Sequence, residues 1–417
     1  MKAAGFLCAL MFVLTPAHAA EAPAVGFEEV RFSYDDEAPL VAGIWYPTSA
    51  PPADVAPERW PGVLTDAPVA GTRLPLVVLS HGGGASYAGH YDTAIALARA
   101  GFVAAAVSHA GDTFDDESKV LQLWRRPAQL RRLVTYMLAE WPAHHRLDAA
   151  RIGAFGYSNG GFTVLCAAGG APDLTRIGSY CRAHPDHNLC TAMREAGLDP
   201  EHPPIDVPAD AWVADPRIKA IVVAAPAFAF AFDRRDLRAV KIPIQLWRAA
   251  DDHRQPHPYY EEALRKALPR APEYHVVPGA GHFAFLPPCG AALAAAKPGI
   301  CTDAPGFDRG AFHEEFNAGI VRFFRAHLAL RGVSGAPVRS PSDIVARSST
   351  AIFHRPHLLV RMCRNAARGA SSRNRDGRIS NLVTVVPWLC VDVVSARALQ
   401  RRRHGKSCHG HRAALFR

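Results

Sequence analysis

Continuous hydrophobic runs alternate with amphipathic runs along most of this chain. The most continuous runs, at residues 74–80 and 102–107, predict strands buried on both faces. Further strands are predicted at residues 152–155, 218–224, 243–247 and 273–277. Between them, hydrophobic residues recur with the period of a helix, at residues 91–100, 129–141, 162–168, 259–267 and 309–330. Such alternation is typical of a doubly wound, mostly parallel α/β sheet with helices on both faces.

Three stretches depart from this alternation. Residues 25–34 and 41–46 alternate polar with apolar positions, which predicts an opening antiparallel ribbon, and a connection rich in proline and alanine follows at 47–71. Residues 169–215 are polar and contain prolines and histidines. This insertion is either a lid over the functional site or a long surface excursion, and both interpretations stay open.

The first 20 residues have the pattern of a secretory signal peptide. Lys2 precedes an apolar stretch at 6–14, and Ala17-His18-Ala19 has the form of a cleavage site. The apolar stretch is too short to span a bilayer, and no later run is long enough. We therefore expect a secreted or periplasmic protein without stable membrane insertion, whose main domain occupies residues 21–331.

The positive charge of the chain belongs to its C-terminal part. The whole chain carries a net +9, but residues 335–417 hold 16 Lys and Arg against 3 Asp and Glu, which is +13 and leaves −4 for residues 1–334. The basic composition is therefore no indication that the main domain binds nucleic acid. Residues 332–417 are interpreted as a disordered tail, a small extra module or translated sequence that forms no folded domain.

Eight of the nine cysteines lie after the signal peptide, and an oxidising compartment permits disulfides. Cys181 and Cys190 are nine residues apart in one polar stretch, and Cys289 and Cys301 are twelve apart in another. Each pair is predicted to close its own loop, whereas Cys166, in an apolar helix, is predicted to be a buried free thiol. No spacing of His or Cys has the quality of a zinc site, and we expect neither a metal nor another cofactor.

A possible nucleophile lies where a predicted strand meets a predicted helix. Residues 156–160 read Gly-Tyr-Ser-Asn-Gly, the Gly-x-Ser-x-Gly pattern of a nucleophile elbow, with Ser158 at its centre. In the elbow the serine adopts unusual backbone angles, and side chains at the flanking Gly156 and Gly160 would collide as strand and helix converge. A structural turn is the alternative interpretation, and the flanking strand and helix favour the elbow.

The partners of such a serine follow in the order acid, then histidine. Asp251 and Asp252 come directly after the strand at 243–247; we favour Asp252 as the acid, and Asp251 stays an alternative. His282 follows the strand at 273–277 in a glycine-rich loop, and it is the predicted base. His253 is the rival histidine, but its position beside the acid is unsuited to reaching both partners.

An oxyanion hole needs two fixed N–H donors. The main-chain N–H of Asn159 opens the helix after the elbow and is the first candidate. Gly83 is the second candidate, because it lies in His81-Gly82-Gly83-Gly84 after a buried strand, where glycines allow close approach of the backbone to a substrate.

These segments together resemble a known family. Residues 76–84, 153–161 and 279–282 are similar to the predicted dienelactone hydrolases, close to the branch of α/β-hydrolases that includes platelet-activating-factor acetylhydrolase, as is Ile44-Trp45-Tyr46-Pro47. The resemblance covers about residues 25–330 and implies an α/β-hydrolase fold. Authentic dienelactone hydrolases use a cysteine nucleophile, whereas this chain has Ser158. That difference favours a general carboxylic ester hydrolase acting on a small-molecule ester.

Other functions remain compatible with this sequence. A lipase or phospholipid-acyl hydrolase is a close variant, although no membrane-docking helix is evident. A peptidase on the same fold is another, but no large domain precedes the hydrolase to restrict access. A catalytically inactive binding protein is the alternative from a different class, and the presence of Ser158, Asp252 and His282 argues against it.

Overall fold

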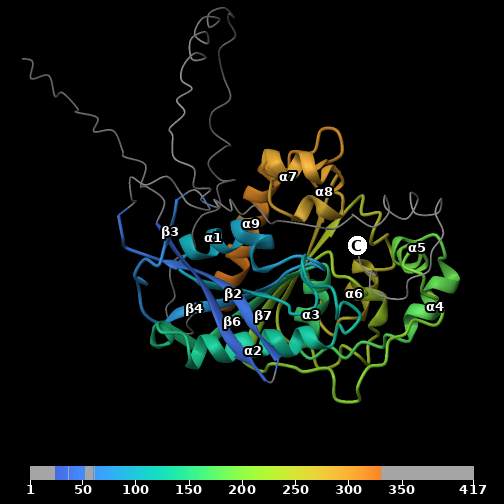
Figure 1. The fold of residues 1–417 in the computed structure, drawn as a ribbon, viewed down its shortest axis with the longest axis horizontal. Coiled ribbons are helices and arrows are strands. Elements are labelled where there is room, and N and C mark those ends of the chain that lie inside the picture. Colours follow the sequence, from blue (N-terminus) through green and yellow to red (C-terminus); the bar gives the residue numbers. More distant parts are fainter. Residues whose placement is uncertain (1–23, 36, 52–59, 61, 330–417) are drawn as a thin grey trace, which may run out of the picture. The chain divides into compact units, whose positions relative to one another are not determined.

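The computed structural model of the chain describes residues 24–35, 37–51, 60 and 62–329 (Figure 1). The predicted signal peptide at 1–20 and the basic region from residue 332 lie outside the described residues. All of the elements discussed below belong to the main domain.

Nine strands form one sheet in the order β3-β1-β2-β5-β4-β6-β7-β8-β9. The pairs β1/β2 and β2/β5 are antiparallel, and all other neighbouring strands are parallel. The bounds of the strands are β1 Val25–Tyr34, β2 Glu37–Pro47, β3 Val63–Thr65, β4 Leu74–Ser80, β5 Val103–Ser108, β6 Leu147–Tyr157, β7 Ile218–Ala224, β8 Ile244–Ala249 and β9 Glu273–Val277. The opening antiparallel ribbon and the run of parallel strands were both predicted from the sequence.

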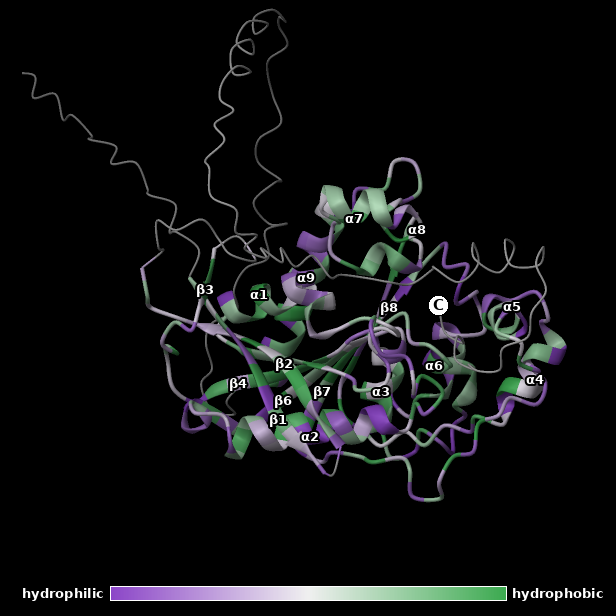
Figure 2. Ribbon diagram, in the orientation of Figure 1, coloured by the Kyte–Doolittle hydropathy of each residue, from purple (hydrophilic) through white to green (hydrophobic). Residues whose placement is uncertain are grey.

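Helices cover both faces of the sheet, which is the α/β-hydrolase fold that the sequence predicted (Figure 1). One face carries α1 Tyr91–Arg99 and α9 Arg309–His327, and the other carries α2 Arg125–Ala139, α3 Asn159–Ala167 and α6 Glu261–Ala267. Alternate residues of β4 therefore enter different hydrophobic clusters: Leu76 and Val78 face α2 and α3, while Val77 and Leu79 face α1. Figure 2 shows hydrophobic residues along these central strands.

Several short elements were not predicted. The insertion at 169–215 contains α4 Arg176–Ala183 and α5 Asn188–Glu195, and the segment between Cys289 and Cys301 contains α7 Ala291–Ala296 and α8 Pro298–Cys301. Single turns of 3₁₀ helix occur at Tyr87–His90, His144–Arg146, Ala229–Ala231 and His282–Phe285. The helices α4 and α5 were missed because they lie in a polar insertion that contains prolines. Cys181 and Cys190 therefore lie on helices and not in the loop that we expected.

The cysteine predictions are confirmed for the described residues. Cys181 is bonded to Cys190, and Cys289 is bonded to Cys301. Cys166 is a buried free thiol in α3. Each disulfide joins elements that are too small to have a core of their own.

Candidate active site

Ser158 lies at the sharp turn between β6 and α3. Its backbone angles, φ 54° and ψ −119°, are outside the regions that most residues adopt. The flanking glycines are required by space. A Cβ atom at Gly156 would lie 2.0 Å from the carbonyl oxygen of Gly160, and a Cβ at Gly160 would lie 1.9 Å from the carbonyl oxygen of Ser80 on β4. The turn therefore presents the serine beyond the carboxyl end of the sheet.

The structure brings the three predicted residues together at this edge. His282 Nε2 lies 3.2 Å from Ser158 Oγ, and His282 Nδ1 lies 2.7 Å from Asp252 Oδ2. The imidazole can therefore accept the serine proton through Nε2 while Nδ1–H donates to the carboxylate. Ser158 follows β6, Asp252 follows β8 and His282 follows β9, so the parallel strands deliver all three to one place.

Of the two adjacent aspartates, Asp252 is the one beside His282. Its side chain is buried, whereas Asp251 is exposed. The second carboxylate oxygen of Asp252 accepts hydrogen bonds from the main-chain N–H groups of Arg254 at 2.9 Å and Gln255 at 2.8 Å. Burial alone would raise the pKa of Asp252, but the charge of His282 and these hydrogen bonds outweigh it and hold the pKa below its usual value.

The turn that carries His282 is held from two sides. The hydroxyl of Tyr157, on the elbow strand, donates to the carbonyl oxygen of His282 at 3.0 Å. His313 on α9 donates through Nε2 to the carbonyl oxygen of Ala284 at 2.9 Å, and its Nδ1 lies 2.6 Å from a carboxylate oxygen of Asp92 on α1. These supporting residues could not be predicted from the sequence, because a tyrosine, a histidine and an aspartate far apart in the chain form no motif.

The two predicted oxyanion residues lie next to one another. Gly83 and Asn159 both line the cavity that the serine faces. A Cβ at Gly83 would lie 2.7 Å from the side-chain nitrogen of Asn159, so only glycine fits against that carboxamide. The neighbouring Gly84 is unsuited as a donor because its N–H is bonded to Asp112 Oδ1 at 2.8 Å.

A buried polar network lies behind this glycine loop. Arg126 on α2 forms an ion pair with Asp112, with 2.5 Å between Nη1 and Oδ2, and both side chains are almost completely buried. Burial lowers the pKa of Arg126 and raises that of Asp112, and their mutual attraction opposes both shifts. Burial, followed by the charge of Arg126, lowers the pKa of His81 and of His109 well below the ordinary histidine value, so both imidazoles are neutral near pH 7.

The cavity beside Ser158 has a volume of about 100 Å³ and a mostly apolar wall. Its wall is contributed by the glycine loop, by α5, by the segments after β7 and β8 and by the disulfide-closed segment near α8. The lining residues outside the triad and the glycine loop include Leu189, Ala192, Ala227, Phe228, Arg254, Tyr260, Phe283, Leu286 and Ile300. A cavity of this size and character accommodates a small or medium apolar group.

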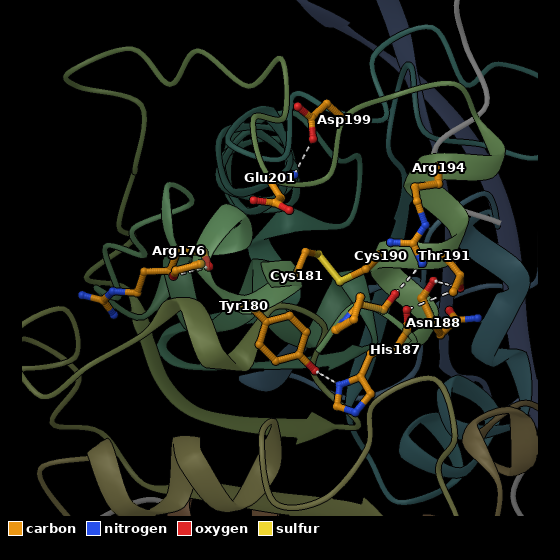
Figure 3. Close-up of a disulfide and its surroundings, with 12 residues drawn as sticks. Arg176, Tyr180, Cys181, His187, Asn188, Cys190, Thr191, Arg194, Asp199 and Glu201 are labelled. Atoms are coloured by element: carbon orange, nitrogen blue, oxygen red, sulfur yellow. Dashed lines mark hydrogen bonds between the residues drawn. A yellow bond between two sulfur atoms is a disulfide. The ribbon is translucent and has the colours of Figure 1, made fainter. Parts of the chain in front are cut away.

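The part of the insertion that reaches the cavity is α5, which contributes Asn188, Leu189 and Ala192 to the wall. Figure 3 shows how the Cys181–Cys190 disulfide links α5 to α4, and how the hydroxyl of Tyr180 contacts His187 Nδ1, at 2.8 Å. The Tyr180 ring also stacks on Phe230 with 3.9 Å between ring centroids, next to Tyr260 of the cavity wall. The position of α5 is thus determined by a covalent link and by an aromatic cluster.

Two properties of the described residues concern the binding of a metal ion and the presence of helices that could span a membrane. Within the ranges given above, no group of three or more His, Cys, Asp or Glu side chains has the arrangement of a metal site. None of the helices described is long and apolar enough to cross a bilayer.

No protein-family model matches the chain, and no curated protein matches it. Among solved structures, it is similar to a ferulic acid esterase from Streptomyces cinnamoneus, with 19% identity over 78% of this chain and 96% of that chain, at a TM-score of 0.48. It is also similar to a dienelactone hydrolase from Anabaena variabilis, with 15% identity over 74% of this chain and 100% of that chain, at a TM-score of 0.42. These values describe a likeness of fold.

Proposed function

We propose that this protein is a serine hydrolase that cleaves small carboxylic esters through an acyl-enzyme. The observation that supports the proposal most directly is the pair of distances from His282, 3.2 Å to Ser158 Oγ and 2.7 Å to Asp252 Oδ2. The volume of the cavity, about 100 Å³, favours a small acyl group over a long lipid chain.

In the first half-reaction, Ser158 Oγ attacks the ester carbonyl carbon while its proton passes to His282 Nε2. Asp252 holds the Nδ1–H tautomer and stabilises the imidazolium that forms. The oxygen of the tetrahedral intermediate carries the negative charge, and the main-chain N–H groups of Gly83 and Asn159 are its proposed donors. When the intermediate collapses, the alkoxide leaves with the proton from His282, and the acyl group stays on Ser158.

The second half-reaction repeats the same proton movements with water. His282 accepts a proton from a water molecule as the water oxygen attacks the acyl carbonyl, and it returns that proton to Ser158 as the carboxylic acid departs. The buried hydroxyl of Tyr157, whose pKa is raised well above its usual value by burial, stays protonated and keeps its hydrogen bond to the turn of His282 throughout.

We also propose that the protein acts in an oxidising compartment, secreted or periplasmic. The two disulfides, Cys181–Cys190 and Cys289–Cys301, support this location because such bonds persist mainly outside the reducing cytosol. Each disulfide holds a segment that contributes a residue to the cavity wall, Leu189 beside Cys190 and Ile300 beside Cys301. The bonds that support the proposed location therefore lie close to the proposed active site.

A fluorophosphonate probe tests the proposed nucleophile. The wild-type protein should be labelled stoichiometrically and should hydrolyse p-nitrophenyl acetate, whereas Ser158→Ala should lose both properties. Ser179→Ala, which removes an exposed hydroxyl on α4, is the matched control and should behave as the wild type. Labelling that persists in Ser158→Ala would show that another residue is the nucleophile. A wild-type protein that is neither labelled nor active would contradict the proposal that the protein is a serine hydrolase.

A series of p-nitrophenyl esters from acetate to octanoate separates the esterase from the lipase alternative. For a cavity of about 100 Å³ we expect kcat/KM to be highest for the short acyl chains and to fall at the longer ones. A preference for octanoate that increases above the solubility limit of the ester would favour the lipase instead.

A further inference from the structure

The buried polar network behind the glycine loop contacts both segments that carry the proposed oxyanion donors. The carbonyl oxygen of His81 accepts a hydrogen bond from Arg126 Nη2, and the N–H of Gly84 donates to Asp112 Oδ1 at 2.8 Å. The ion pair therefore holds the chain immediately before and immediately after Gly82 and Gly83. These two glycines lie between the fixed points.

The same ion pair reaches the beginning of α3. Arg126 Nε donates to Thr163 Oγ1 at 3.1 Å, and that hydroxyl donates to the carbonyl oxygen of Asn159 at 2.7 Å. Asn159 Nδ2 also lies 3.5 Å from Asp112 Oδ2. The ion pair is thus connected both to the glycine loop and to the beginning of α3, although Asp112 follows β5 and Arg126 belongs to α2.

His81 fixes the peptide group that carries the N–H of Gly83. His81 Nε2 accepts the main-chain N–H of His109 at 3.0 Å, so the proton of this neutral imidazole is on Nδ1. Nδ1–H then donates to the carbonyl oxygen of Gly82 at 2.6 Å. Because that carbonyl and the N–H of Gly83 belong to one planar trans peptide unit, holding the carbonyl also sets the direction of the N–H.

We propose that Arg126 and Asp112, acting with His81, are positioning residues that hold the N–H groups of Gly83 and Asn159 in register for the oxyanion. The inference rests on the proposed function. Its physical basis is that preorganised donors stabilise the transition state without a reorganisation cost, so a displaced donor lowers kcat more than it weakens substrate binding. If the ion pair served folding alone, its loss would lower stability but would not lower kcat more than it weakens substrate binding.

Three variants of the network separate these roles. Asp112→Asn retains an oxygen for Gly84 but leaves the charge of Arg126 uncompensated. Arg126→Lys keeps the charge but cannot reach Asp112, His81 and Thr163 at once. Thr163→Val is the mildest, because it removes only the hydroxyl between Arg126 and Asn159 while preserving shape. Asp215→Asn is the matched control: it breaks the ion pair between the buried Asp215 and the partly exposed Arg217 (2.6 Å) just before β7 begins, at the other end of the sheet.

With p-nitrophenyl acetate we expect each of the three network variants to lower kcat, by roughly tenfold to a hundredfold for Asp112→Asn and Arg126→Lys, with KM changed less than about twofold. The affinity for a trifluoromethyl ketone, which forms a tetrahedral adduct, should fall in parallel with kcat/KM. Asp215→Asn should lower the Tm without altering kcat. A normal kcat in Asp112→Asn or in Thr163→Val would overturn the proposal, and Thr163→Val decides the matter if the charged variants do not fold.

Amide hydrogen exchange gives a readout that is independent of ester hydrolysis. Residues 81–84 and the first turn of α3 should exchange faster in Asp112→Asn and Thr163→Val than in the wild type and in Asp215→Asn. Unchanged exchange in these segments would contradict the positioning role even if the protein proved to hydrolyse no ester. Failure of the proposed function would instead show as an inactive wild type whose network variants still exchange faster.

Discussion

At the scale of single residues, Asp251 and Asp252 differ in what surrounds them. Only Asp252 is buried, receives two main-chain N–H donors and lies beside His282 Nδ1. Asp252→Asn preserves the size of this side chain but presents the imidazole with an amide, which favours the wrong tautomer. We expect kcat for p-nitrophenyl acetate to fall about 10⁴-fold, as it does when a triad acid is replaced in this way.

Asp251→Asn is the matched control for this substitution. Its side chain is exposed, so we expect kcat within about twofold of the wild type. Steady-state kinetics on the two variants, with circular dichroism to verify folding, provide the measurement. If the two variants lost activity equally, the assignment of the acid would be wrong.

The sequence predicts some residues of this site far better than others. Ser158 and His282 stand in short glycine-containing patterns at predicted strand ends. Space requires the glycines at 156 and 160 around Ser158, and Gly279 before His282 has a positive φ of 70°. Asp112 and Arg126 have no such pattern: Arg126 precedes the helix we predicted at 129–141, in a chain with many arginines, and its burial depends on three other segments. Pairing of this kind is a property of tertiary packing and cannot be deduced from spacing.

At the scale of the elements, the elbow depends on the close crossing of α3 over β4. A methyl group at Gly160 would lie 1.9 Å from the carbonyl oxygen of Ser80, which is rigid backbone in the centre of the sheet. We expect Gly160→Ala to lower the free energy of unfolding by about 3 kcal/mol, as severe overpacking does. Urea unfolding followed by fluorescence measures this change.

Gly299→Ala is the comparison for the elbow substitution. Gly299 lies in α8, where an added Cβ would meet nothing within 4 Å. Because alanine is favoured over glycine in a helix by about 1 kcal/mol, this variant should be neutral or slightly more stable. Equal stability of the two variants would show that β4 and α3 separate easily to accept a side chain.

The wall formed by α5 predicts a change in substrate selectivity. Leu189 lines the cavity, and the Cys181–Cys190 disulfide next to it holds α5 in place (Figure 3). Leu189→Ala removes three carbon atoms from the wall. We expect the ratio of kcat/KM for p-nitrophenyl hexanoate to that for the acetate to rise roughly tenfold, the range that one or two methylene groups supply in a hydrophobic pocket.

Leu198→Ala is the control for the wall, because Leu198 belongs to the same insertion but lines a different hollow of the surface. Its hexanoate-to-acetate ratio should equal that of the wild type. An unchanged ratio in Leu189→Ala would mean that the acyl chain of the ester occupies another part of the cavity. In that case α5 would contact the alcohol part of the ester or no part of the substrate.

Burial and local composition decided which elements could be predicted. Strands β4 and β7 are buried almost throughout, so they appear as hydrophobic runs whose bounds match the structure. The three-residue β3 and the eight-residue α4 and α5 lie in polar or proline-containing connections and were not predicted, although the seven-residue α6 was. Packing against the rest of the domain determines β3, α4 and α5. That is why the segment lining one side of the cavity was expected only as an irregular insertion.

At the scale of the whole described domain, several buried histidines have the same electrostatic consequence. His81, His90 and His109 are all buried, and burial is the main reason that the pKa of each is lowered, to about 4 for His90. In an unfolded chain a histidine binds its proton near pH 6.5. Between that pH and the folded-state pKa, the unfolded state binds more protons than the folded state, so stability must fall as the pH decreases.

We therefore expect the buried histidines to lower the free energy of unfolding between pH 7 and pH 4, with His90 alone accounting for roughly 3 kcal/mol over that interval. Burial raises the pKa of Asp112 and of Glu261, so protonation of these two carboxyl groups has the opposite sign and offsets part of the loss. The pKa values of Asp92 and Asp252 lie below their usual range, and their protonation destabilises the fold only at lower pH. Urea unfolding at pH 7, 6, 5 and 4 measures how the free energy of unfolding depends on pH.

His90→Leu should make this pH dependence less steep. The imidazole of His90 packs against Phe155 and Tyr157, and within the described part of the chain neither of its nitrogens has a hydrogen-bond partner. An equally steep slope in His90→Leu would show that the acid sensitivity has another source.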